Sequence, residues 1–138
     1  MSDGFALALQ KALRTSLLAD GEVVALVSTR VYDEPPQNVV YPYIRFGSIV
    51  PDTYDTDGST SANVAFTLEC YSRTTGRVQA SQIAEAVRAA LHRNEAAVVP
   101  TGFGVVELIC EQYFVDRDDS VGRGYTARVL FSAIMETA

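Results

Sequence analysis

The sequence has few of the side chains that build active sites and metal centres. Its only histidine is His92, and its two cysteines, Cys70 and Cys110, lie far apart. One histidine excludes sites with two histidine ligands, and any Ser/His/Asp arrangement would need His92. The cysteines lack C-x-x-C spacing, so we interpret them as buried apolar residues in a reducing cytoplasm, not a disulfide. The sequence predicts no cofactor, no metal and no enzyme, with His92 a surface residue or helix-end cation.

Long apolar runs are also absent, since none approaches the ~20 residues that span a bilayer. The opening Met1-Ser2-Asp3 is acidic, unlike a signal peptide, so we expect assembly in the cytoplasm and no membrane partner. The net charge of −6 works against nonspecific DNA binding, because neutralising phosphates needs clustered cations. Lys11 is the only lysine, and all other cations are arginine. Arginine suits fixed ion pairs and interfaces, although a biased genome composition gives the same excess.

The residues that are present suit one domain spanning 1–138, which is large enough to bury a core without staples. One apolar stripe has helical spacing: Phe5, Leu9, Leu13 and Leu17. Ser2 or Asp3 can cap this helix, and Asp20-Gly21 ends it. Two more helices are predicted at Glu22–Val27 and Arg77–Arg93, the latter closing with Asn94 in a left-handed conformation.

The clearest strand pattern runs over Asn63–Ser72, where apolar and polar side chains alternate. Further strands are predicted at Val31–Asp33, Tyr43–Val50, Val105–Asp116 and Tyr125–Glu136. The last two form a hairpin, so the predicted fold is α+β: a mainly antiparallel four- to five-stranded sheet with two amphipathic helices packed on one face. The predicted core contains Leu9, Leu13, Phe66, Leu68, Ile83, Val87, Val129 and Phe131.

Two acidic segments are predicted to be loops. Residues 52–62 hold turn formers and one large apolar side chain, Tyr54, so we expect a loop that is mobile in the free subunit and ordered against a neighbour. Asp55-Thr56-Asp57-Gly58 weakly resembles a calcium loop, but Phe66 stands where its glutamate would be, which favours a turn. Residues 116–124 read as a solvated hairpin in which Arg117 and Arg123 can pair with Asp116, Asp118 and Asp119.

The order of the parts carries a family resemblance. Arg30-Val31-Tyr32-Asp33 is followed by two prolines, by Tyr41-Pro42-Tyr43-Ile44 and by Gly47. The strand Val64–Arg73 and the helix Ala80–His92 come next, and paired C-terminal strands complete the set. Over nearly its whole length the chain resembles the tail-completion or tail-terminator family of long-tailed phages and gene-transfer agents.

This resemblance implies a structural ring subunit, usually in six copies, that ends tail-tube polymerisation and joins the tail to the head. Its implied partners are copies of itself, the tail-tube protein and the head connector or stopper protein, with DNA passing through the ring without sequence-specific binding. It implies no catalytic residues. It places ring and tube contacts in the two acidic segments, whose candidate residues are Asp52, Tyr54, Asp55, Asp57, Asp116, Arg117, Asp118, Asp119 and Arg123.

Two alternatives stay open at this point. One is another structural protein of similar build, such as a head–tail adaptor or a baseplate protein. The other is an enzyme of small-molecule metabolism, which a well-formed pocket with convergent polar groups would support.

Overall fold

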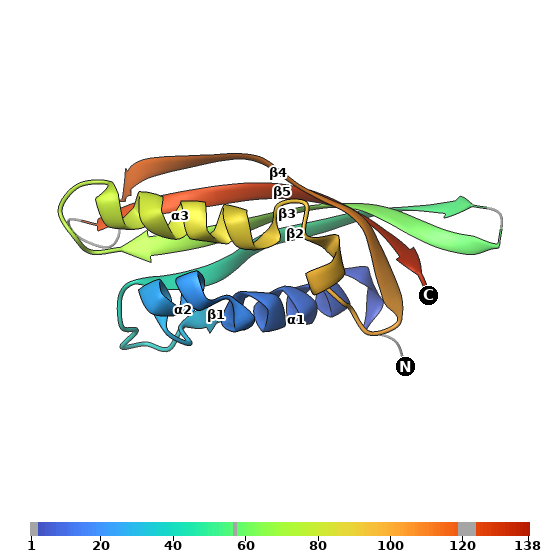
Figure 1. Cartoon of the computed structure of the whole chain (residues 1–138), viewed down its shortest axis with the longest axis horizontal. Helices are drawn as coiled ribbons and strands as arrows, with labels where there is room; N and C mark the ends of the chain where they lie inside the picture. Colours follow the sequence, from blue (N-terminus) through green and yellow to red (C-terminus); the bar gives the residue numbers. More distant parts are fainter. Residues whose placement is uncertain (1–2, 57, 119–123) are drawn as a thin grey trace.

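A computed structural model describes residues 3–56, 58–118 and 124–138 and shows three helices beside a five-stranded sheet (Figure 1). The elements are α1 (Gly4–Ala19), α2 (Gly21–Val27), β1 (Val31–Tyr32), β2 (Tyr43–Thr56), β3 (Ser59–Ser72), α3 (Val78–Leu91), the short 3-10 helix η1 (Glu95–Ala97), β4 (Phe103–Asp118) and β5 (Gly124–Thr137). The strand order is β1-β2-β3-β5-β4, and every neighbouring pair is antiparallel except β1 with β2. The predicted α+β fold is confirmed.

The helices form because each has one apolar side to bury. In α1 the buried side chains are Ala8, Leu9, Ala12, Leu13 and Leu17. The Asp20 carboxylate accepts the backbone N–H groups of Glu22 and Val23 at 3.1 Å, which caps α2 directly after α1 ends. α3 buries a stripe of small and branched residues, Ala80, Ile83, Ala84, Ala86, Val87, Ala90 and Leu91.

The core lies between these helices and one face of the sheet. At its centre the rings of Phe66 on β3 and Phe131 on β5 stack, with centroids 5.1 Å apart. All eight predicted core residues are at most 2% exposed. No described element covers the other face, and we call this the outer face. On the outer face Ala65 of β3 is exposed and its neighbour Val50 of β2 is 57% exposed.

The predicted loop over residues 52–62 is wrong. β2 and β3 continue as a paired hairpin in which Asp52 faces Asn63 and Thr56 faces Ser59. Two residues of the same hairpin, Ser61 and Ala62, also pair with β5 and are buried. Backbone hydrogen bonds therefore offset the ordering entropy that the segment's few apolar side chains could not. We call residues 52–62 the acidic arm.

Smaller differences concern the ends of elements. Asp3 makes no capping hydrogen bond and instead forms an ion pair with Lys11 at 2.8 Å. After α3 the left-handed conformation belongs to Arg93, with φ of 58°, and not to Asn94. β4 extends two residues further at each end than predicted, so Phe103 and Asp118 lie in the strand.

We expect Leu68→Ala to lower the free energy of unfolding by roughly 2–5 kcal/mol, because Leu68 is fully buried on β3 and its loss leaves a cavity. Chemical denaturation measures this change. Thr67→Ala is the matched control, since Thr67 is the half-buried neighbour on the outer face and should cost about 1 kcal/mol or less. Equal midpoints for Leu68→Ala and the parent would contradict the core assignment.

Hydrogen exchange separates a paired arm from a loop. The amides of residues 61–64 lie in a strand with partners on both sides, so in the free subunit they should exchange on the order of 100-fold slower than in an unstructured peptide. Mass spectrometry of peptic fragments gives the rates. Exchange of these amides as fast as in an unstructured peptide would contradict the paired strands and favour the loop.

Candidate assembly surfaces

The structure places the predicted interface residues at two opposite ends of the molecule. Asp52, Tyr54 and Asp55 belong to the acidic arm, where β3 begins. At the far end of β3, Ser72 pairs with Tyr125, which pairs with Arg117. β3 has 14 residues, so the two groups are separated by roughly 45 Å at a rise of ~3.3 Å per residue. They form two surfaces and not one. Three further candidates, Asp57, Asp119 and Arg123, lie outside the described residues.

The acidic arm carries negative charge and has no cation in its own sequence. Asp52 and Tyr54 alternate onto the outer face, and Asp55 lies on the helix side, where it accepts a hydrogen bond from the Thr60 hydroxyl at 3.1 Å. Tyr54 is 41% exposed. Residues 52–62 include no lysine, arginine or histidine. Residues 52–55 of the arm are therefore a solvated acidic surface with one exposed aromatic ring.

At the opposite end the predicted residues divide between the two faces of the sheet. Asp116 pairs with Thr126, and the Thr126 hydroxyl donates to the Asp118 carboxylate on the same, outer face. Arg117 lies between these two residues in β4 and so belongs to the helix side. This end consequently has acidic groups on one face and a cation on the other.

Sequence reasoning missed a second cationic feature at this end, the turn Arg73–Arg77 between β3 and α3. The Arg73 guanidinium lies over the Tyr41 ring, 4.4 Å from its centroid, and that of Arg77 lies 5.2 Å from the centroid of Tyr125. Arg77 also donates to the Val115 carbonyl at 3.4 Å. The signal was present in the sequence Arg-Thr-Thr-Gly-Arg, where two cations flank a glycine turn without an acid between them.

A tyrosine cluster borders this turn. The Tyr43 ring lies 5.1 Å from Tyr41 and stacks on Tyr71 at 4.9 Å, and the Tyr71 hydroxyl donates to Glu69 at 2.8 Å. Burial, together with the neighbouring Tyr41, raises the pKa of Tyr43, so its phenol stays neutral. The Tyr41-Pro42 peptide bond is cis. β2 begins directly after it at Tyr43, where the sequence predicted the strand to start.

The edge of β4 is blocked by the chain that follows α3. His92 Nδ1 accepts the Cys110 backbone N–H at 2.9 Å, the Arg93 N–H donates to the Leu108 carbonyl at 2.8 Å, and the Glu95 carboxylate accepts the Leu108 N–H at 2.9 Å. Such contacts use the polar groups that would otherwise pair with another strand. His92, predicted as a surface residue or helix-end cation, is half-buried and joins the end of α3 to β4.

The edge of β2 is less protected. β1 pairs with it only at Ile44 and Arg45, and a bulge follows between Phe46 and Ile49. Past that bulge, no described strand pairs with the outer edge of β2 as far as Thr56. Pro51, which has no N–H to donate, interrupts this stretch. The acidic arm is therefore also the exposed edge of the sheet.

Hollows on the described surface are open and shallow. One of about 460 Å³ lies between α2 and α3, with an apolar floor that includes Leu26 and Ala86 and a rim that includes Glu22 and Glu85. Its polar side chains are Glu22, Gln82 and Glu85, and the rest of its lining is apolar. Among the described residues no three His, Cys, Asp or Glu side chains gather as a metal site. No described helix is long and apolar enough to cross a membrane.

Comparison with known proteins shows which family the chain belongs to. The family model described as Tail completion protein gp17 matches residues 11–136. The chain belongs to this family. A chain of the virion of a native gene transfer agent (GTA) particle has the same fold, with a TM-score of 0.86 and 26% identity. That likeness covers 98% of this chain and 99% of the other. No curated protein matches the sequence.

Both matches agree on the kind of protein. This member of the tail completion family is a structural component of a phage-type tail particle, as the family resemblance implied. Its exposed surfaces are therefore candidates for contacts within such a particle. The match to residues 11–136 includes both the acidic arm and the Arg73–Arg77 turn.

The two cysteines of this family member should differ in reactivity. Both are free, Cys70 is buried and Cys110 is half-buried, and burial raises the pKa of each thiol. With a thiol-reactive dye at pH 8 we expect one modification in native protein, slower than for free cysteine and faster as the pH rises. Cys110→Ser should remove it, and Cys70→Ser should leave it unchanged. Two rapidly modified thiols in the native protein would contradict the burial of Cys70.

Proposed function

We propose that this protein forms a ring at the head-proximal end of a tail tube, where it stops tube polymerisation and joins the tail to the head. The observation that carries the proposal is the family match over residues 11–136. The near-complete overlap with a chain of a gene transfer agent virion supports it. The partners are copies of the same chain, six in the form that the family resemblance implies, together with the tail-tube protein and a head connector or stopper.

The open sheet suits a subunit that is completed by its neighbours. Apolar side chains on the outer face include Val50 and Phe114, which are 57% and 40% exposed. Leu130 and Ile134 of β5 lie between them on the same face and are half-buried. Apolar surface of this kind is characteristic of protein contacts, and in a ring it would lie against another protein.

The charge of the chain suits a channel for DNA. A net charge of −6 and an arm without cations give DNA phosphates little to bind. A ring of such subunits would let the duplex pass without holding it. This agrees with DNA as cargo of the particle and not as a sequence-specific ligand.

Deleting the gene tests the function. We expect tails of uncontrolled length, or tails that do not join heads, because nothing would end the tube or present a surface to the connector. Negative-stain electron microscopy gives the length distribution and the joined fraction. Expression of the wild-type chain should restore both, and so should His92→Ala, which removes only the contact between α3 and β4. Normal-length, joined tails in the deletion strain would refute the proposal.

A further inference from the structure

The acidic arm and the Arg73–Arg77 turn have complementary charges that one subunit cannot bring together. The arm's sequence holds Asp52, Asp55 and Asp57 and no cation, and the turn holds two arginines and no acid. They lie at the two ends of β3, which spans Ser59–Ser72. The separation of roughly 45 Å is several times the Debye length of ~10 Å at 0.1 M salt. Neither surface can neutralise the other within the same molecule.

The turn is held in a fixed conformation. The Ser72 side chain is fully buried; its hydroxyl donates to Gln79 at 2.7 Å and bonds the Thr74 hydroxyl at 3.0 Å. Arg73 and Arg77 are each placed over a tyrosine ring, and neither has a carboxylate partner among the described residues. Fixing the two guanidinium groups in advance lowers the entropy cost of binding an anionic partner.

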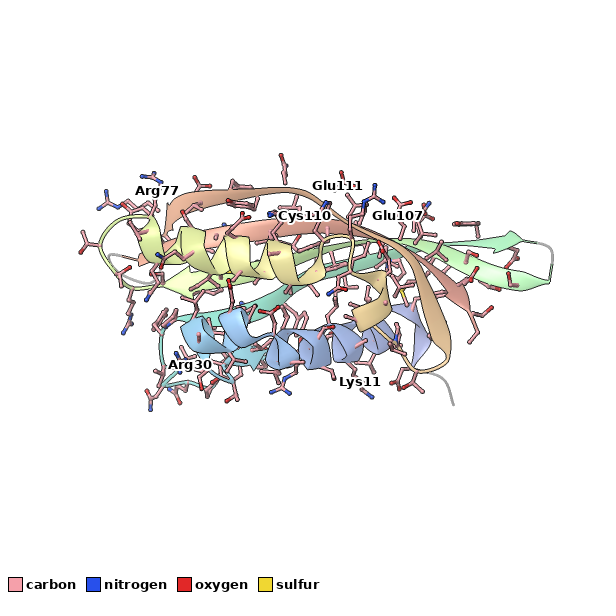
Figure 2. All side chains as sticks on the ribbon, viewed as in Figure 1. Lys11, Arg30, Arg77, Glu107, Cys110 and Glu111 are labelled. Carbon is pink, nitrogen blue, oxygen red and sulfur yellow. The ribbon has the colours of Figure 1, made fainter. Side chains whose placement is uncertain are left out.

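The arm is equally available. In Figure 1 the ends of β2 and β3 extend past the helix layer, and Figure 2 labels Arg77 at the opposite end of the molecule. Asp52 has no cation near it among the described residues, and Asp55 contacts only the Thr60 hydroxyl. No described strand pairs with the outer edge of β2 there, so the arm can approach another molecule with its backbone as well as its carboxylates.

We propose that the acidic arm of one copy docks on the Arg73–Arg77 turn of the next copy in the ring. The partner is a second copy because the complementary surface is present on this same chain, at its other end. A contact between two different surfaces of identical subunits is head-to-tail, and repeating it generates a closed ring or a helical filament. The inference rests on the proposed ring and adds the surfaces that join its subunits.

Reversing the charges tests this contact. The arm variant is Asp52→Arg with Asp55→Arg, and the turn variant is Arg73→Asp with Arg77→Asp. Each alone would bring like charges together and should weaken self-association by about tenfold or more. An equimolar mixture should recover it, because each variant's arm then meets a turn of opposite charge on the other variant. A single chain carrying all four changes should associate in the same way.

The matched control is Lys11→Asp with Arg93→Asp, which changes the net charge as much as the turn variant but at exposed sites away from both surfaces. It should associate like the wild type. Thermal melts of every variant confirm folding. Association is read from the mass distribution of purified protein by mass photometry, and from the joined tails counted in cells that lack the native gene. Higher salt should weaken association of the wild type.

The outcomes separate this inference from the proposed function. Recovery in the mixture supports head-to-tail docking. Rings formed by the arm variant alone or by the turn variant alone would overturn the contact, while the deletion phenotype would still support the ring. Failure of the mixture to recover would also overturn it. If the arm variant formed rings that no longer bound the tail-tube protein, the arm's partner would be the tube and not a second copy.

Discussion

The two-sided pairing of β3 is the constraint on which the rest of the structure depends. β3 lies between β2 and β5, and from Ser61 to Tyr71 every residue except Thr67 has partners on both sides. This pairing fixes the register that stacks Phe66 on Phe131 and gives the helices one continuous apolar face to cover. It also sets the length of the molecule, because the acidic arm and the Arg73–Arg77 turn are the two ends of this one strand.

A sheet covered on one face still has two edge strands whose backbone groups could pair with other chains. Here the two edges, β4 and β2, are protected in different ways. At β4, backbone groups that could pair with another strand are bonded instead to His92, Arg93, Glu95 and Arg77. At β2, only Ile44 and Arg45 are covered by β1. Pro51 and the aspartates of the arm then limit indiscriminate pairing, because proline cannot donate and like charges repel. The edge of β2, protected by charge, can still bind a partner of opposite charge. The edge of β4 cannot, because its backbone groups are already bonded.

Periodicity predicted the parts of the fold that have one buried side. Residues 63–72 alternate cleanly because one face packs on helices, and α1 and α3 show their stripes for the same reason. The acidic arm has no such signal, since most of its side chains meet solvent and a polar strand then resembles a loop. Asp57-Gly58 was the available clue, because this dipeptide favours a hairpin turn, and Gly58 has φ of +82°. The dipeptide predicts a hairpin only when strands flank it, and the polar composition of the flanking segments did not indicate strands.

Other features depend on neighbours that a sequence does not reveal. Gly47 belongs to the motif that carried the family resemblance, yet its reason is spatial: a Cβ there would lie 3.1 Å from the Thr67 carbonyl and 3.2 Å from the Glu69 carboxylate. Arg73 and Arg77 could be seen as two cations near a glycine, but not as groups held over tyrosines from β5 and the chain before β2. Half of the candidate site could therefore be predicted from the sequence. Composition alone indicated the acidic arm, whereas the Arg73–Arg77 turn was recognised only in the tertiary structure. That asymmetry follows from the chemistry, since an acidic cluster is local in sequence and a preorganised guanidinium pair is made by contacts across the fold.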